Sequence, residues 1–200
     1  MLDTTPAPLS RAQLRRQLRA QRRALSPSAQ RQAAQKLYRQ LAQHPLFRRA
    51  RHIALYLAND GEIDPHLLLR AAQKRGKATY LPLLNRWPRT HMAFQRIRPG
   101  ERLQANRFGI LEPRPNRAQQ RPVWSLDLVL LPLVGFDRHG GRLGMGGGFY
   151  DRSLAYRSRR KNWQKPTLLG LAHECQQVPH LAMASWDVPL QGTVTDGGWY

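Results

Sequence analysis

The stretch DLVLLPLVGFDRHGGRLGMGGGFYDR, residues 127–152, decides the fold class of this chain. It begins with an apolar run, residues 127–136, which is typical of a strand buried inside a parallel sheet. A glycine-rich loop follows, and residues 149–156 have the composition to begin a helix. We therefore predict a central strand, a glycine loop and a helix N-terminus, an arrangement whose backbone N–H groups bind anions such as phosphate.

The residues around this loop favour a binding site over a flexible turn, although the glycines alone leave the turn as an alternative. Arg142 and Arg152 bracket the loop and Asp151 follows it, whereas flexible linkers are rich in Gly and Ser and carry no such charges. The loop matches neither a Walker loop nor a dinucleotide-binding fingerprint. Without a Cβ atom, its glycines can take positive φ angles and bring several N–H groups close to an anion: Gly144, Gly146, Gly147 and Gly148.

The rest of the chain alternates between helix and strand patterns. Two amphipathic helices are expected first, at 9–25 and 27–43, the second with Ser26 as N-cap and Pro27 at its first position. We read the proline-rich span 112–122 as a connecting loop. Apolar runs predict further strands, and one more helix lies between them behind Asp64: strands at 53–58, 78–84, 91–97 and 167–172, a last segment at 191–195, and a helix at 65–74.

This alternation predicts a three-layer α/β fold, with a mostly parallel sheet, helices on both faces and an N-terminal helical pair. We expect residues 1–10 to be a disordered extension and residues 11–200 to form a single domain. A hydrophobic content of 41% is enough for a substantial core.

Composition also bears on the compartment. The single cysteine, Cys175, has no partner for an internal disulfide, which favours a reducing environment. The N-terminus lacks the pattern of a signal peptide, and no apolar run approaches the length of a membrane span. We therefore expect a cytoplasmic protein with no membrane partner.

The formal net charge of +21 makes an RNA-binding protein the chief alternative. The basic residues are mostly arginines spread along the whole chain, and a general arginine bias explains them as well as RNA binding does. A basic surface also attracts anionic small molecules. We therefore expect no required nucleic-acid partner.

Several carboxylates are candidates for chemistry. Asp60, Glu62 and Asp64 follow the strand expected at 53–58, at the sheet edge where ligands collect. Asp64 is explained as a helix cap and Asp60 as a turn former, whereas Glu62 has no such local task. Asp151 and Asp187 are two carboxylates that can share one Mg²⁺ ion, although an acid before Val-Pro is often a surface turn residue.

Several separated motifs, in the same order, resemble the 5-formyltetrahydrofolate cyclo-ligase family, also called methenyltetrahydrofolate synthetases. The resemblance covers nearly everything after about residue 10 and implies an ATP- and Mg²⁺-dependent conversion of 5-formyltetrahydrofolate to 5,10-methenyltetrahydrofolate, giving ADP and phosphate, on an α/β fold. The motifs are Tyr56-Leu57, Gly61-Glu62-Ile63-Asp64, FGILEP at 108–113, DLVLLP at 127–132, Phe136-Asp137, 142–152 and WDVPL at 186–190.

The resemblance also implies roles for individual residues. Arg142 and Tyr150 are the catalytic candidates, and Asp151 and Asp187 are the implied ligands of Mg²⁺. Leu57 and Glu62 would contact the folate, Glu62 by accepting hydrogen bonds from the pterin. ATP would be bound by Arg11, Arg15, Arg142, Gly144, Gly146, Gly147, Gly148, Phe149 and Tyr150, and the folate would share the loop at Met145, Gly146, Gly147, Gly148, Phe149 and Tyr150. A kinase-like α/β enzyme of other specificity remains a further alternative.

Overall fold

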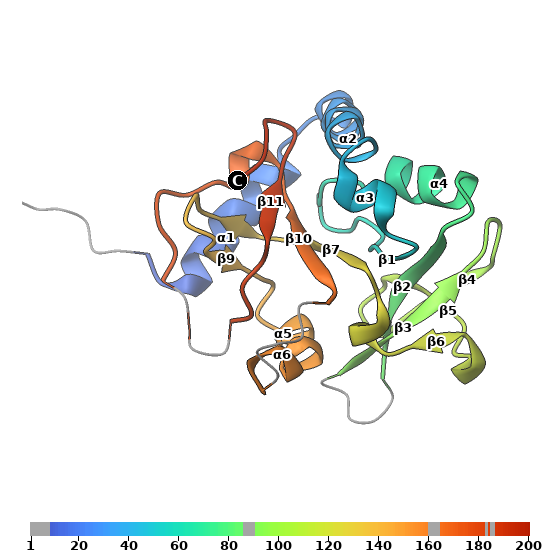
Figure 1. Cartoon of the computed structure of the whole chain (residues 1–200). Helices are drawn as coiled ribbons and strands as arrows, with labels where there is room; N and C mark the ends of the chain where they lie inside the picture. Colours follow the sequence, from blue (N-terminus) through green and yellow to red (C-terminus); the bar gives the residue numbers. More distant parts are fainter. Residues whose placement is uncertain (1–8, 86–90, 160–164, 183, 185–186) are drawn as a thin grey trace, which may run out of the picture.

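The computed structural model describes residues 9–85, 91–159, 165–182, 184 and 187–200. Within these residues the centre of the molecule is a seven-stranded sheet in the order β11-β10-β7-β1-β2-β3-β6 (Figure 1). Neighbouring strands from β11 to β2 are parallel, and β3 and β6 join antiparallel, so the predicted mostly parallel sheet is confirmed. The strands are β1 His52–Ala54, β2 Ala78–Leu84, β3 Met92–Ile97, β6 Gln120–Arg121, β7 Leu128–Pro132, β10 Thr167–Leu171 and β11 Gly192–Val194.

Strand β7 lies inside the sheet because its side chains are apolar on both faces. Leu128 and Leu130 pack into one core cluster with Leu37 and Leu68, while Val129 and Leu131 pack into the other. This alternation follows from the two-residue period of a strand. One apolar run therefore supplies both layers of the core.

Helices cover both faces, as expected. α2 Pro27–Leu41, α3 Pro45–Arg49 and α4 His66–Lys74 lie together on one side of the sheet, and α5 Phe149–Leu154 and α6 Tyr156–Arg159 lie on the other (Figure 1). The short α3 was not predicted. No described helix is both long and apolar enough to span a membrane. The described residues also form the short 3-10 helices η1 Arg117–Gln119, η2 Val123–Ser125 and η3 Glu174–Gln176.

The first helix, α1 Arg11–Arg23, begins with a capping box in which Ser10 and Gln13 satisfy each other's backbone N–H groups. Its buried residue Leu18 packs against Val134 and Leu143 instead of joining α2 in the main layer. Residues 1–8 of the predicted extension lie outside the described residues. The N-terminal helical pair is therefore present, but its two helices serve different parts of the molecule.

Four expected elements differ from the structure. The strand expected at 53–58 is the short β1, which ends at Ala54. The strand expected at 127–136 ends at Pro132, and β8 Gly135–Phe136 pairs instead with β9 Arg142–Leu143 in a separate sheet beneath α1. The expected loop 112–122 contains β6, and its first residues belong to β5 Leu111–Pro113, which pairs with β4 Leu103–Ala105. The helix expected at 149–156 is divided into α5 and α6. These elements are two to six residues long, too short for a periodic sequence signal.

Candidate active site

A cleft with a volume of about 1820 Å³ opens at the carboxyl ends of β1, β2 and β7. This is the edge at which ligands collect in parallel α/β sheets. Pockets for one small molecule usually measure about 300–1,000 Å³. The cleft is therefore large enough for two substrates side by side.

All of the predicted site residues line this one cleft, although they come from distant parts of the sequence. Their side chains and backbone are contributed by α1, the segment after β1, the glycine loop with α5, and the segment before β11. They are Arg11, Arg15, Leu57, Glu62, Arg142, Gly144, Met145, Gly146, Gly147, Gly148, Phe149, Tyr150, Asp151 and Asp187.

Helix α1 brings two of these arginines to one side of the cleft. Arg15 Nε donates to the carbonyl of Gly144 at 2.8 Å, and Arg11 Nη1 donates to the carbonyl of Ala182 at 2.8 Å. Because the two residues are four apart, they share a helix face. Burial, followed by the nearby charge of Arg11, lowers the pKa of Arg15, while the charge of Asp187 acts in the opposite direction.

The glycine loop crosses the cleft with backbone angles that side chains disfavour. Gly146 has φ 92° and Gly148, the N-cap of α5, has φ 61°. The Arg152 guanidinium folds back onto the carbonyl of Gly147 and lies 5.6 Å from the centre of the Phe149 ring. Since α5 is only six residues long, its dipole is small, and attraction for an anion depends on the neighbouring arginines.

The two predicted metal ligands are each paired with an arginine. Asp151 forms an ion pair with Arg142, and Asp187 Oδ2 accepts from Arg11 at 3.4 Å and from the backbone N–H of Ala184 at 2.9 Å. No group of three or more His, Cys, Asp or Glu side chains with metal-ligand geometry occurs among the described residues. Carboxylate oxygens of this kind fit Mg²⁺, which takes its remaining oxygen ligands from phosphate and water.

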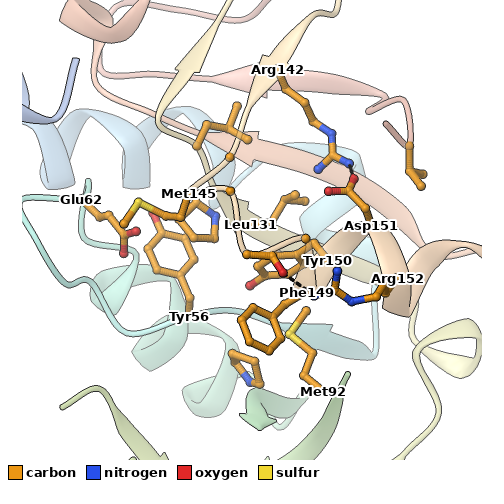
Figure 2. Close-up of a pocket in the computed structure, with 18 of the residues that line it drawn as sticks. Tyr56, Glu62, Met92, Leu131, Arg142, Met145, Phe149, Tyr150, Asp151 and Arg152 are labelled. Atoms are coloured by element: carbon orange, nitrogen blue, oxygen red, sulfur yellow. Dashed lines mark hydrogen bonds and ion pairs between the residues drawn. The ribbon is translucent and has the colours of Figure 1, made fainter. Parts of the chain in front are cut away.

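Glu62 lies on the opposite side of the cleft, with Tyr56 and Met145 near it and with Phe149 and Tyr150 between it and the Arg142–Asp151 pair (Figure 2). Its side chain is 11% exposed, and its Oε2 accepts from the N–H of Asn59 at 3.1 Å. Burial raises the pKa of Glu62 to about 7, against the opposing charge of Arg22. Glu62 is therefore a hydrogen-bond acceptor whose charge varies near neutral pH.

Tyr150 keeps its proton at neutral pH. Burial, followed by the charge of Glu62, raises the pKa of its phenol well above the usual value. The side chain is thus a hydrogen-bond donor and not a base. Its side chain lies between Glu62 and the Arg142–Asp151 pair (Figure 2).

The interpretation of Asp60 as only a turn former was incomplete. Asp60 has the φ of 54° that a turn of this kind requires, but its carboxylate also binds three arginines of α1: Arg19, Arg22 and Arg23. Although burial alone would raise it, hydrogen bonds from these arginines lower the pKa of Asp60 to about 2. The spacing of the arginines marks a helix face, but nothing in the sequence indicates the acid that it meets.

One wall of the cleft was not foreseen. The hairpin of β4 and β5 contributes Asn106, Phe108, Ile110 and Leu111. Phe108 is 56% exposed, and its ring meets the ring of Phe149 edge to face, with 6.2 Å between ring centres. The sequence motif at 108–113 suggested relationship to a family but not this position.

Taken with the fold, the residues define an α/β protein whose cleft is lined by arginines near one end and by the mostly buried carboxyl group of Glu62 at the other. The 5-formyltetrahydrofolate cyclo-ligase family model matches residues 8–196, and the chain belongs to this family. It is 41% identical to the 5-formyltetrahydrofolate cyclo-ligase of Haemophilus influenzae, covering 90% of this chain and 94% of the relative. It is 38% identical to the enzyme of that name from Escherichia coli, covering 89% and 96%.

A solved structure agrees with the fold. The NMR structure of Aquifex aeolicus 5,10-methenyltetrahydrofolate synthetase superposes with a TM-score of 0.80 at 28% identity, covering 96% of this chain and 92% of that one. The resemblance inferred from the sequence motifs is therefore confirmed.

Proposed function

We propose that this protein converts 5-formyltetrahydrofolate to 5,10-methenyltetrahydrofolate with ATP and Mg²⁺, releasing ADP and phosphate. The observation that carries the proposal is the gathering of all the predicted site residues in one cleft, in a chain 41% identical over 90% of its length to a cyclo-ligase. Family membership favours this activity over RNA binding and over a kinase-like enzyme of other specificity.

In this reaction the formyl oxygen attacks the γ-phosphorus of ATP and ADP leaves. The second amine nitrogen of the folate then attacks the activated formyl carbon, closes the ring and expels phosphate, which carries away the formyl oxygen. No covalent bond to the protein is needed, so catalysis depends on positioning and on stabilising charge.

Residues near the first turns of α1 suit the nucleotide. Arg15 extends from α1 to Gly144 of the glycine loop, and Arg11, on the same helix face, extends to Ala182 and Asp187. Arg142 lies on the strand that leads into the glycine loop. Their guanidinium groups would bind phosphate oxygens, and loop N–H groups would add further donors. Arg142 and Tyr150 would stabilise the charge that develops on the transferred phosphoryl group.

Asp151 and Asp187 would hold Mg²⁺, which when bound would neutralise charge on the phosphates. For the carboxylates to become available, Arg142 and Arg11 must turn from them to the phosphates. The positive charge of the arginines beside the two carboxylates is then replaced by that of Mg²⁺, and the negative charge of the carboxylates beside the two arginines is replaced by that of the phosphates.

The opposite side suits the folate. Glu62 would accept hydrogen bonds from the pterin, and Leu57, Met145 and Phe149 would provide apolar contacts. The Tyr56 hydroxyl is already engaged, since it donates to the carbonyl of Ile63 at 2.6 Å, so Tyr150 is the more available donor in this group of side chains. The two ligands would meet at Tyr150.

The test is to mix the protein with 5-formyltetrahydrofolate, ATP and Mg²⁺ and to follow the absorbance of the methenyl product. Product should appear with one ADP for each turnover, and omission of ATP should prevent it. ADP without methenyl product would instead support a kinase-like enzyme. Salt-sensitive RNA binding without turnover would support the RNA-binding alternative.

A further inference from the structure

Arg22 is a fully buried arginine in a helix whose other arginines contact solvent or the cleft. Its side chain is 0% exposed, although it lies next to the half-exposed Arg23. A buried guanidinium costs free energy unless its donors are matched by acceptors. The acceptors that the Arg22 guanidinium contacts therefore indicate which segments of the fold it connects.

The Arg22 guanidinium joins three segments around the cleft. Nε donates to the carbonyl of Asp60 at 2.8 Å and Nη2 to its carboxylate at 2.9 Å, both in the turn after β1. Nη1 donates to the carbonyl of Leu133, just beyond β7, at 3.2 Å. Nη2 also lies 3.9 Å from the sulfur of Met145 in the glycine loop and 3.7 Å from Oε1 of Glu62.

The backbone of α1 also packs directly on the same turn. Gly61 has φ 74°, and a Cβ atom there would lie 3.1 Å from the carbonyl oxygen of Arg22. The side chain of Gln30 donates to the carbonyls of both Arg22 and Gly61, at 3.1 and 3.3 Å. The turn that carries Glu62 is thus fixed to the last turns of α1.

The first turns of the same helix hold the other end of the cleft. Arg11 contacts Asp187, and Arg15 contacts Gly144 of the glycine loop. Helix α1 therefore connects the phosphate-binding residues to the turn that carries Glu62, and Arg22 is the contact at the Glu62 end.

We propose that Arg22 is a positioning residue that places its charge beside Glu62, directs Glu62 at the folate and fixes the folate-binding turn to the nucleotide-binding helix. The folate part rests on the function proposed above. Arg22 need not touch either substrate for this role. It acts through Glu62 and through the carbonyl of Asp60.

The charges around Glu62 support this role. Arg22 and Arg19 face it from α1, Asp60 from its own turn, Tyr56 from the segment after β1, and Tyr150 from α5. Burial is the main influence that raises the pKa of Glu62, and Arg22 is the strongest opposing one. Loss of the Arg22 charge should therefore leave Glu62 protonated at neutral pH.

The experiment compares Arg22→Met with Arg22→Lys and with Arg23→Met as a matched control. Arg23 binds the same aspartate but is 53% exposed on its side chain and makes no contact with Glu62 among those described. In each protein the Glu62 carboxyl would be titrated by carbon-13 NMR, with the signal assigned by its loss in Glu62→Gln. The Michaelis constants for folate and ATP would be measured from pH 6 to 9.

For Arg22→Met we expect the Glu62 midpoint to rise by about one pH unit, since an opposite charge at this distance shifts a carboxyl by roughly that much or more. The folate Michaelis constant should rise at least about fivefold at pH 7 and recover only in part at pH 9, because methionine lacks the fork as well as the charge, while that for ATP changes less than about twofold. Arg22→Lys should restore the midpoint but not the full folate affinity, because lysine lacks the fork that joins three segments. Arg23→Met should resemble the wild type.

An unchanged Glu62 midpoint in Arg22→Met would overturn the proposal. So would a parallel rise of both Michaelis constants at every pH, which indicates a merely structural role. If Arg22→Met does not fold, Arg22→Lys decides by the split between the two Michaelis constants. If the wild-type protein makes no methenyl product, the proposed function is refuted but the proposal for Arg22 is not. The effect of Arg22 on the Glu62 midpoint would still be tested by NMR.

Discussion

Arg142 and Asp151, nine residues apart, form an ion pair across the glycine loop. One is the proposed phosphate-binding cation and the other a proposed Mg²⁺ ligand. Arg142 Nε is buried and has no hydrogen-bond partner among the described residues. The pair therefore balances two charges and leaves one guanidinium donor for which a phosphate oxygen is a suitable partner.

Asp151→Asn should weaken the response to Mg²⁺. The amide keeps the shape of the carboxylate but removes its charge, and even outer-shell changes at metal sites cost about 10- to 100-fold. We expect the Mg²⁺ concentration for half-maximal activity to rise by at least about tenfold, and likewise for Asp187→Asn. A Mg²⁺ titration of the initial rate measures this. Glu101→Gln, at an exposed acid, is the control, and an Asp151→Asn titration that superposes on it would contradict the metal assignment.

Glu62→Gln should affect the folate more than the nucleotide. A hydrogen bond to a charged group contributes about 1.5–3 kcal/mol, or about 10- to 100-fold in affinity. We expect the Michaelis constant for folate to rise by this factor and that for ATP to change less than about twofold. Steady-state kinetics at pH 8 would show it. A larger effect on ATP would move Glu62 to the nucleotide side.

The same substitution should stabilise the fold at high pH. The pKa of Glu62 is about 7 in the folded protein and 4.5 as a reference, so ionisation removes stability as the pH rises through this window. The glutamine side chain of the variant does not titrate. We expect the unfolding free energy of Glu62→Gln, relative to the wild type, to increase by about 3 kcal/mol between pH 4 and pH 8. Urea unfolding at both pH values measures it, and a difference independent of pH would argue against a buried carboxylate.

Asp60→Asn should destabilise the protein at neutral pH, and this loss of stability should decrease at acid pH. The Asp60 pKa of about 2 lies below its reference of 3.8, so its ion pairs stabilise the fold above pH 4 and lose that effect as the pH falls toward 2. Asparagine tolerates the positive φ, so the backbone is kept. We expect the free energy of unfolding to be about 2 kcal/mol lower than that of the wild type at pH 7, and this difference to become smaller below pH 4. Urea unfolding measures it. Equal free energies of unfolding for Asp60→Asn and the wild type at pH 7 would show that the ion pairs of Asp60 with the three arginines do not stabilise the fold.

Gly148→Ala should destabilise the protein more than Gly144→Ala. Gly148 has φ 61°, and a Cβ there would lie 2.7 Å from Arg152 Nη1, whereas nothing lies within 4 Å of a Cβ at Gly144. A left-handed alanine costs about 1–2 kcal/mol. Thermal unfolding of the two variants measures the difference, and equal melting temperatures would contradict it.

Much of the fold could be predicted because its long elements have clear periodicity. Ala78–Leu84 was predicted to the residue, and Ser26 and Pro27 marked the start of α2. The two-stranded pairs were missed because β8 and β9 have two residues each and depend on contacts with α1. Short strands of this kind are specified by tertiary packing and not by local pattern.

For the site, the sequence motifs identified many of the residues that line the cleft, but not the wall formed by the β4–β5 hairpin or the residues that hold the site in place. Glu62 was selected because it had no local task, and it does lie in the cleft. Arg22 could not be found, because in sequence it is one of several arginines in an amphipathic helix. Only the fold brings Asp60 and Leu133 to its guanidinium.

The contact between Arg11 and Ala182, 171 residues apart, has a consequence for synthesis of the protein. On the ribosome, the helix that carries Arg11 emerges well before the segment that it contacts. A nascent or prematurely released chain that ends before Asp187 therefore lacks half of the proposed metal pair. Activity should begin only when translation has delivered this segment to a helix that was made many residues before it.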